Sequence, residues 1–108
     1  MPKKLKILVI RFSSIGDIVL TTPVIRCLKL QTNAEIDFLT KTNYKEVIIS
    51  NPNISEVYCI SKYSNPLEVL RSNNYDIVID LQNNFRSLKL RLQLAVKSYT
   101  YSKNSLKR

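Results

Sequence analysis

Two polar turns hold the residues of this 108-residue chain that are best suited to chemistry. The first turn contains Ser13, Ser14, Gly16 and Asp17, and Gly16 is the only glycine of the chain. Serine hydroxyls and backbone N–H groups at the start of a helix favour binding of an anion or a sugar hydroxyl. Asp17 has two interpretations: an N-cap that binds unpaired N–H groups, or a general base that takes a proton from an attacking hydroxyl.

The second turn, at residues 82–85, follows an apolar run that ends at Asp80. The planar guanidinium of Arg86 suits a carboxylate or phosphate of a substrate, and a charge on a helix surface is an equal alternative. Asn83 suits sugar hydroxyls, although asparagine is also a common turn former. We expect Asp80 to be an end-of-strand carboxylate that accepts hydrogen bonds from backbone or serine groups.

The composition excludes several kinds of chemistry. Histidine is absent, which removes Ser-His-Asp, Cys-His and most zinc sites, so acid–base work falls to a carboxylate, a lysine or a tyrosine. The first turn lacks the three glycines of a dinucleotide fingerprint and the GK[ST] of a P-loop. Cys27 and Cys59 lie far apart, so we expect buried thiols rather than a metal site or a redox pair. We therefore expect no cofactor and no metal.

The net charge of +9, from 17 Lys and Arg against 8 Asp and Glu, favours anionic partners or simply serves solubility. A specific nucleic-acid binder is the weakest interpretation, because the basic residues are spread along the chain and are not interleaved with its tyrosines. No apolar run approaches the roughly 18 residues of a membrane span, and the amino terminus does not resemble a secretory signal. We expect a cytoplasmic protein, with the inner membrane contacted at most peripherally.

Apolar runs of strand length alternate with helix-like segments, which indicates βαβ units. The expected strands lie at residues 6–11, 35–40, 56–61, 76–81 and 98–101, and helices follow Asp17 and lie at 44–50, 67–72 and 86–96. Right-handed crossovers then predict an α/β fold with a doubly wound, Rossmann-like parallel sheet of order 3-2-1-4-5. Because strands one and four are neighbours in that order, the turns at 12–17 and 82–86 would line one crevice.

Side-chain patterns predict which faces are buried. The first helix carries an apolar stripe of Ile18, Val19, Val24, Ile25 and Leu28. Pro23 either kinks this helix or opens the main helix at its first position, with Thr22 as cap, and we favour the second.

Two later segments also carry burial predictions. The continuous apolar run Ile77, Val78 and Ile79 is typical of a strand covered on both faces. In the last helix we expect Leu88, Leu92 and Ala95 or Val96 to face the core, and Lys89 and Arg91 to face solvent.

The stretch 6–29 closely resembles the opening of glycosyltransferase family 9, the heptosyltransferases of lipopolysaccharide core assembly. Residues 75–87, YDIVIDLQNNFRS, resemble the second signature of that family, YD-x-VIDLQ…RS, and the resemblance covers nearly the whole chain. It implies that Asp17 is the catalytic base. It also implies that Ser13, Ser14, Asn83 and Arg86 face the acceptor.

The implied reaction is inverting transfer of a heptose, or a related sugar, from a nucleotide-diphosphate donor to an acidic, lipid-linked acceptor. The resemblance further implies a GT-B architecture of two Rossmann-like domains facing a cleft. We expect residues 1–108 to form an incomplete amino-terminal, acceptor-side domain, without the carboxyl-terminal domain that binds the donor nucleotide.

For such a fragment we expect no transferase activity of its own, and self-association through an exposed edge and apolar face. The alternative is a non-catalytic, flavodoxin-like module that binds an anionic ligand or partner.

Overall fold

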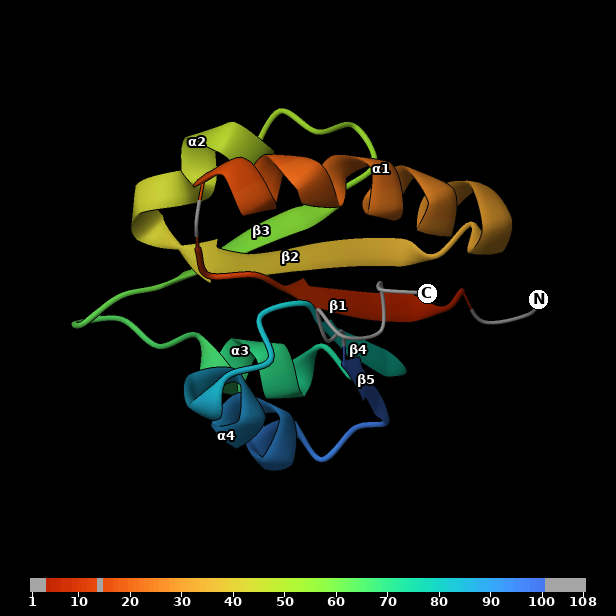
Figure 1. Ribbon diagram of the computed structural model, residues 1–108. Coiled ribbons are helices and arrows are strands. Elements are labelled where there is room, and N and C mark those ends of the chain that lie inside the picture. The colour runs from red at the N-terminus through yellow and green to blue at the C-terminus, as the bar shows by residue number, and fades with distance from the viewer. Residues whose placement is uncertain (1–3, 14, 101–108) are drawn as a thin grey trace, which may run out of the picture.

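The computed structural model describes residues 4–13 and 15–100, which fold around a parallel sheet of order β3-β2-β1-β4-β5. The strands are β1 (Lys6–Ile10), β2 (Glu35–Lys41), β3 (Glu56–Ile60), β4 (Ile77–Asp80) and β5 (Ser98–Thr100). The helices are α1 (Ile15–Thr32), α2 (Lys45–Ile48), α3 (Leu67–Ser72) and α4 (Phe85–Leu94), with a 3₁₀ turn at Thr42–Tyr44. Helices α1 and α2 cover one face of the sheet, and α3 and α4 cover the other (Figure 1). This architecture confirms the predicted fold class and strand order.

Strand β1 lies at the centre of the sheet and brings the two polar turns together. Its last residue, Ile10, pairs with Leu39 of β2 on one side and with Asp80 of β4 on the other. Because all three strands are parallel, the turns that leave β1 and β4 emerge at the same edge of the sheet. The neighbouring placement of these turns was the central expectation from the sequence, and it is confirmed.

Apolar side chains fill the space on both sides of the sheet. Toward α1 and α2 the buried cluster contains Ile7, Val9, Ile18, Ile25, Ala34, Ile36, Phe38 and Ile48. Toward α3 and α4 it contains Leu8, Ile10, Phe12, Leu39, Ile60, Leu70, Tyr75, Val78, Leu90 and Leu94. Strand β1 supplies both clusters, which explains why its apolar run is continuous rather than alternating.

Helix α1 runs without a break from Ile15 to Thr32 with Pro23 inside it, so the predicted new start at Pro23 is wrong. The buried residues Ile18, Thr21 and Ile25 lie on one face on both sides of the proline. Packing of this shared face against the sheet offsets the backbone hydrogen bond that proline cannot make. Val19 and Val24, which were expected in the buried stripe, are exposed.

Helix α4 buries a different face from the one predicted. Leu90 and Leu94 are buried together with Ser87, whereas Leu92 is 71% exposed and Leu88 39% exposed. Arg91 points inward to the buried Asp80 rather than to solvent. Because leucines occupy every second position from 88 to 94, either Leu88 and Leu92 or Leu90 and Leu94 could face the core. The second pair shares its face with Arg91, and burying that face gives the buried Asp80 a cation.

Two smaller expectations also need correction, and a third is confirmed. Strand β4 is buried fully on one face only, because Val78 and Asp80 are buried while Ile77 and Ile79 are half-buried. Cys27 is exposed and Cys59 half-buried, so the expected buried thiols are not found. The predicted fifth strand is present over Ser98–Thr100, and Tyr101 lies outside the described residues.

In the described part of the chain, no helix is long and apolar enough to cross a membrane.

Candidate functional site

The turns that follow β1 and β4 are joined side by side, and we call them the turn pair: residues 11–17 and residues 81–86. The side chain of Gln82 links them, because its Oε1 accepts hydrogen bonds from the backbone N–H of Phe12 at 3.0 Å and of Ser13 at 3.3 Å. The backbone of the first turn is therefore held by a side chain of the second. Ser14, which the sequence also nominated, lies outside the described residues.

Arg11 forms the second link within the turn pair. Its Nη1 donates a hydrogen bond to the backbone carbonyl of Leu81, and its Nη2 lies 2.9 Å from Oδ2 of Asp17. The Arg11 side chain is 20% exposed and the Asp17 side chain 50% exposed. One planar guanidinium thus contacts both turns at once, as its fork of donors allows.

Asp17 lies in the first turn of α1, two residues inside the helix, so its interpretation as the N-cap is wrong. A carboxylate there interacts favourably with the positive end of the helix dipole. Sequence reasoning identified Asp17 but missed Arg11. The available signal was a cation placed directly after a buried strand and six residues before the only acid of the turn.

Asp80 shapes the second turn and is completely buried. Its Oδ1 accepts hydrogen bonds from the backbone N–H groups of Gln82 at 3.0 Å and Asn83 at 2.8 Å. Its Oδ2 lies 2.8 Å from Nε of Arg91 on α4. Asp80 is therefore an end-of-strand carboxylate that accepts backbone hydrogen bonds, as the sequence predicted, and it fixes Gln82 in place to bind the first turn.

The remaining residues of the second turn divide into structural and exposed groups. Asn84 is the N-cap of α4, with its Oδ1 accepting from the Ser87 N–H at 2.9 Å. Asn83 is exposed and has a positive φ of 49°, which asparagine tolerates better than most residues. Arg86 is exposed, and its guanidinium lies 5.5 Å from the centre of the Phe12 ring, within cation–π range.

The turn pair therefore brings Ser13, Gly16, Asp17, Asn83 and Arg86 to one edge of the sheet. Gly16 is exposed, and a Cβ added to it would meet no atom within 4 Å, so its lack of a side chain is not needed for packing. The half-exposed carboxylate of Asp17 can accept a proton, while Arg86 can bind an anionic group. Among the described residues, His, Cys, Asp and Glu form no group of three that could hold a metal ion.

A second polar cluster lies at the opposite edge of the sheet, where the strands begin. The Tyr75 hydroxyl donates to Oδ2 of the buried Asp37 at 2.6 Å, and Nδ2 of Asn73 lies 3.0 Å from the hydroxyls of Tyr75 and Tyr58. Burial raises the pKa of Asp37, and the nearby Glu35 adds to this, while the hydrogen bond from Tyr75 opposes it. Burial also raises the pKa of Tyr75.

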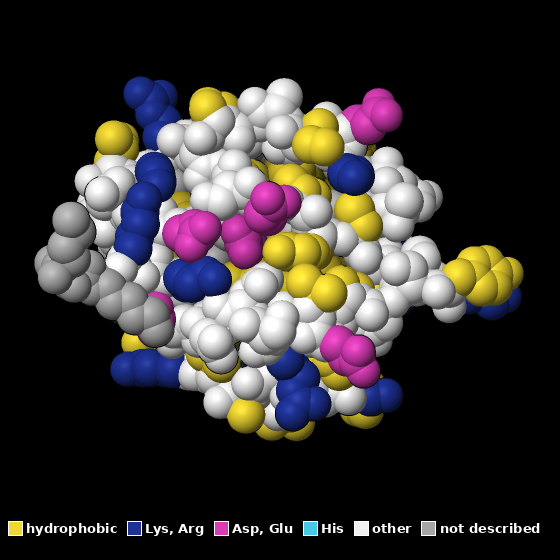
Figure 2. Space-filling model, turned by 180° about the vertical axis from the view of Figure 1, so that it is seen from behind, with side chains coloured by type: hydrophobic (Ala, Val, Ile, Leu, Met, Phe, Trp, Pro, Cys, Tyr) yellow, Lys and Arg dark blue, Asp and Glu magenta, His cyan; other side chains and the backbone are white. Residues whose placement is uncertain are grey.

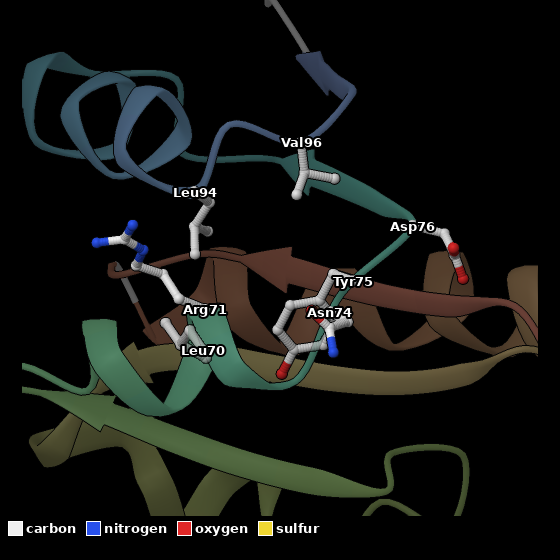
Figure 3. Close-up of a pocket in the computed structure, with 7 residues that line it drawn as sticks. All are labelled: Leu70, Arg71, Asn74, Tyr75, Asp76, Leu94 and Val96. Carbon is white, nitrogen blue, oxygen red and sulfur yellow. The ribbon is translucent and has the colours of Figure 1, made fainter.

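A pocket of about 400 Å³ adjoins this second cluster (Figure 3). Its lining consists of Leu70, Arg71, Asn74, Tyr75, Asp76, Leu94 and Val96. These residues come from the carboxyl ends of α3 and α4 and from the segments that precede β4 and β5, so the pocket lies away from the turn pair. In Figure 3 the Tyr75 hydroxyl points toward the sheet rather than into the space between the leucines. None of these residues was a site candidate from the sequence. The available signal for Asp37 was an aspartate within the alternating run EIDFLT.

Comparisons with known proteins agree on one family. The chain is 30% identical over 111 residues to lipopolysaccharide heptosyltransferase 1 of Campylobacter coli, and the match covers 95% of this chain and 32% of that protein. A crystal structure of a glycosyl transferase of family 9 from Veillonella parvula superposes with a TM-score of 0.77 and 25% identity, over 95% of this chain and 37% of that one.

The heptosyltransferase WaaC of E. coli, solved with ADP, has the same fold, with a TM-score of 0.79 at 21% identity over 96% of this chain and 37% of its own. No family model matches the sequence. The chain thus spans about a third of the length of each of these proteins. From the sequence match and the shared sheet, we conclude that the chain belongs to glycosyltransferase family 9, whose lipopolysaccharide heptosyltransferases it resembles.

Proposed function

We propose that this chain supplies the acceptor side of an inverting glycosyltransferase, which transfers a heptose or a related sugar from a nucleotide-diphosphate donor to an acidic, lipid-linked acceptor of the lipopolysaccharide core. The observation that carries the proposal is the turn pair, in which the half-exposed carboxylate of Asp17 lies at the carboxyl edge of the sheet, where α/β folds bind their ligands. The Campylobacter coli relative supports the sugar, and the WaaC structure with ADP supports the nucleotide.

In the proposed reaction Asp17 removes the proton from the attacking hydroxyl of the acceptor. The acceptor oxygen forms a bond to the anomeric carbon of the donor sugar, and the nucleotide diphosphate leaves with the electrons of the broken bond. One base suffices for this displacement, and neither a cofactor nor a redox partner is needed. Cationic and N–H groups would stabilise the leaving diphosphate.

The exposed residues of the turn pair would bind the acceptor. Arg86 is held over the Phe12 ring and can pair with an acidic group, and Asn83 can bind a sugar hydroxyl. Ser13, Ser14 and the backbone of Gly16 would complete this surface. The net charge of +9 favours approach to an anionic acceptor at a membrane surface.

The test is a sugar-transfer assay on a two-domain protein, in which this chain is joined to the remaining two thirds of the Campylobacter coli relative. Asp17→Asn keeps the size of the side chain and removes the base, so we expect kcat to fall by about 10²- to 10⁴-fold. Glu68→Gln, on the exposed surface of α3, is the matched control for loss of one carboxylate and should keep the parent rate.

Equal rates for the parent and Asp17→Asn would refute the role of Asp17 as base. A two-domain protein that binds the acceptor without transferring sugar would favour the alternative, a non-catalytic module for an anionic ligand. The 108-residue chain by itself should show no transfer, because the donor nucleotide would bind to the other domain.

A further inference from the structure

We infer that Arg11 is the residue that positions the Asp17 carboxylate for the transfer reaction. This inference rests on the proposed function, in which Asp17 acts as the base. No motif in the sequence assigned a role to Arg11; its contacts in the folded chain do.

The guanidinium of Arg11 is itself held in place. It is mostly buried, and Nη1 donates to the Leu81 carbonyl at the end of the neighbouring strand. A planar fork with one nitrogen fixed in this way has little rotational freedom, so the second nitrogen presents a defined direction to its partner. That nitrogen, Nη2, contacts Oδ2 of Asp17 at 2.9 Å.

Asp17, in contrast, is half-exposed and begins a helix whose outer face is in solvent. The contact with Arg11 favours the side-chain rotamers that keep Oδ2 beside the guanidinium. Because Arg11 also contacts the second turn, it fixes the carboxylate relative to Asn83 and Arg86, which the proposed acceptor would contact.

A residue that positions the base should affect kcat, whereas a residue that binds the acceptor should affect KM. In the two-domain protein, Arg11→Gln should lower kcat by roughly 10- to 100-fold, because small misplacement of a reacting group is costly, and should change the KM for the acceptor by less than about threefold. Arg11→Lys keeps the charge but not the fork, and should recover part of the lost kcat.

A double-mutant cycle then separates positioning from general structural support. In the Asp17→Asn background, Arg11→Gln should cause no further loss of kcat, because no base remains to be positioned. Gln82→Ala is the matched structural control. It removes the hydrogen bonds of Gln82 to the first turn but leaves the Arg11–Asp17 contact, so its effect should persist in the Asp17→Asn background.

The contact is also tested without activity, in the 108-residue chain. The Tm losses of Arg11→Gln and Asp17→Asn should sum to more than the loss of the double variant, because each single change breaks the same ion pair. Strictly additive Tm losses would show that the pair does not form in solution, and would overturn the inference.

The kinetic outcomes separate this inference from the proposed function. If Asp17→Asn keeps the parent kcat, both the role of Asp17 as base and the positioning role of Arg11 are refuted. If kcat falls strongly for Asp17→Asn but is unchanged for Arg11→Gln and Arg11→Lys, the positioning role of Arg11 is refuted while the role of Asp17 as base stands. A loss that appears in KM, or that multiplies with the loss of Asp17→Asn, also overturns it, since Arg11 would then act on the acceptor or on the fold.

Discussion

Asp37 is the buried carboxyl group whose environment most clearly links protonation to stability. Burial places its folded-state pKa above the ordinary value of 3.8, so the folded chain binds this proton more tightly than the unfolded chain does. The resulting stabilisation is complete below 3.8 and is lost as the pH rises through the folded-state pKa. At neutral pH, Asp37 therefore opposes folding, and Tyr75 limits that cost with its hydrogen bond.

The raised pKa of Asp37 predicts how the stability of two variants depends on pH, as measured by urea unfolding between pH 3.5 and pH 7. Asp37→Asn cannot ionise, so its stability relative to the parent chain should improve steadily with pH. Tyr75→Phe removes the donor that stabilises the charged form, so its stability relative to the parent should worsen over the same range. Parallel pH profiles for the parent and Asp37→Asn would contradict the assignment.

Among the individual residues, the sequence identified those that carry a recognisable motif and missed those that act through three-dimensional contacts. Asp17 and Arg86 belong to polar turns that topology places together, so they could be nominated before the fold was seen. Arg11 could not, because its role depends on the Leu81 carbonyl, 70 residues away along the chain. Gln82 likewise has the sequence context of an ordinary turn residue. Its role depends on the hydrogen bond that its amide oxygen accepts from the Phe12 N–H of the first turn.

At the scale of the elements, the strands were predictable because each apolar run has β-forming residues and is bounded by turn signals. The orientation of α4 was not, since alternating leucines fit two stripes and only the contact of Arg91 with Asp80 distinguishes them. Pro23 was misinterpreted for a related reason: a local rule for helix starts was overridden by burial of Ile18 and Ile25 on a single face. In both cases tertiary packing decided between two locally acceptable structures.

The orientation of α4 can be checked with two substitutions of similar kind. Arg91→Met leaves the fully buried Asp80 without its cation, which should cost about 3 kcal/mol of unfolding free energy or more. Lys89→Met, on the exposed side of the same helix, should change stability by no more than about 0.5 kcal/mol. Equal effects in urea unfolding would show that α4 packs as the leucine pattern first suggested.

At the scale of the whole molecule, the described surface exposes much apolar area. Leu20 and Leu30 on α1 and Leu92 on α4 are each at least 70% exposed, and β5 is an edge strand of the described sheet. Charge is distributed differently: on the face shown in Figure 2, acidic side chains gather near the centre, while Lys and Arg lie mostly toward the rim. This face therefore offers no continuous basic stripe of the kind that tracks a nucleic acid.

We expect the 108-residue chain to self-associate through exposed apolar side chains, among them Leu92 on α4. Sedimentation velocity should show a mean mass that rises with protein concentration, and Leu92→Lys should reduce the effect, because a charge on a contact surface opposes burial. Leu92 is exposed, so the substitution should leave the Tm nearly unchanged. A strictly monomeric parent chain over the same range would contradict the expectation.

The pairing of β1 with β4 also has a consequence for the order of folding. Strands β1, β2 and β3 follow one another in the chain, whereas β4 reaches β1 only after the chain crosses the sheet. Loop closure makes such distant pairings slow, so a chain that has formed only its first three strands already displays Asp17 but lacks the carbonyl that anchors Arg11. In pulsed hydrogen exchange, the N–H groups of Phe12 and Ser13 should become protected together with β4, which would place completion of the site among the late steps of folding.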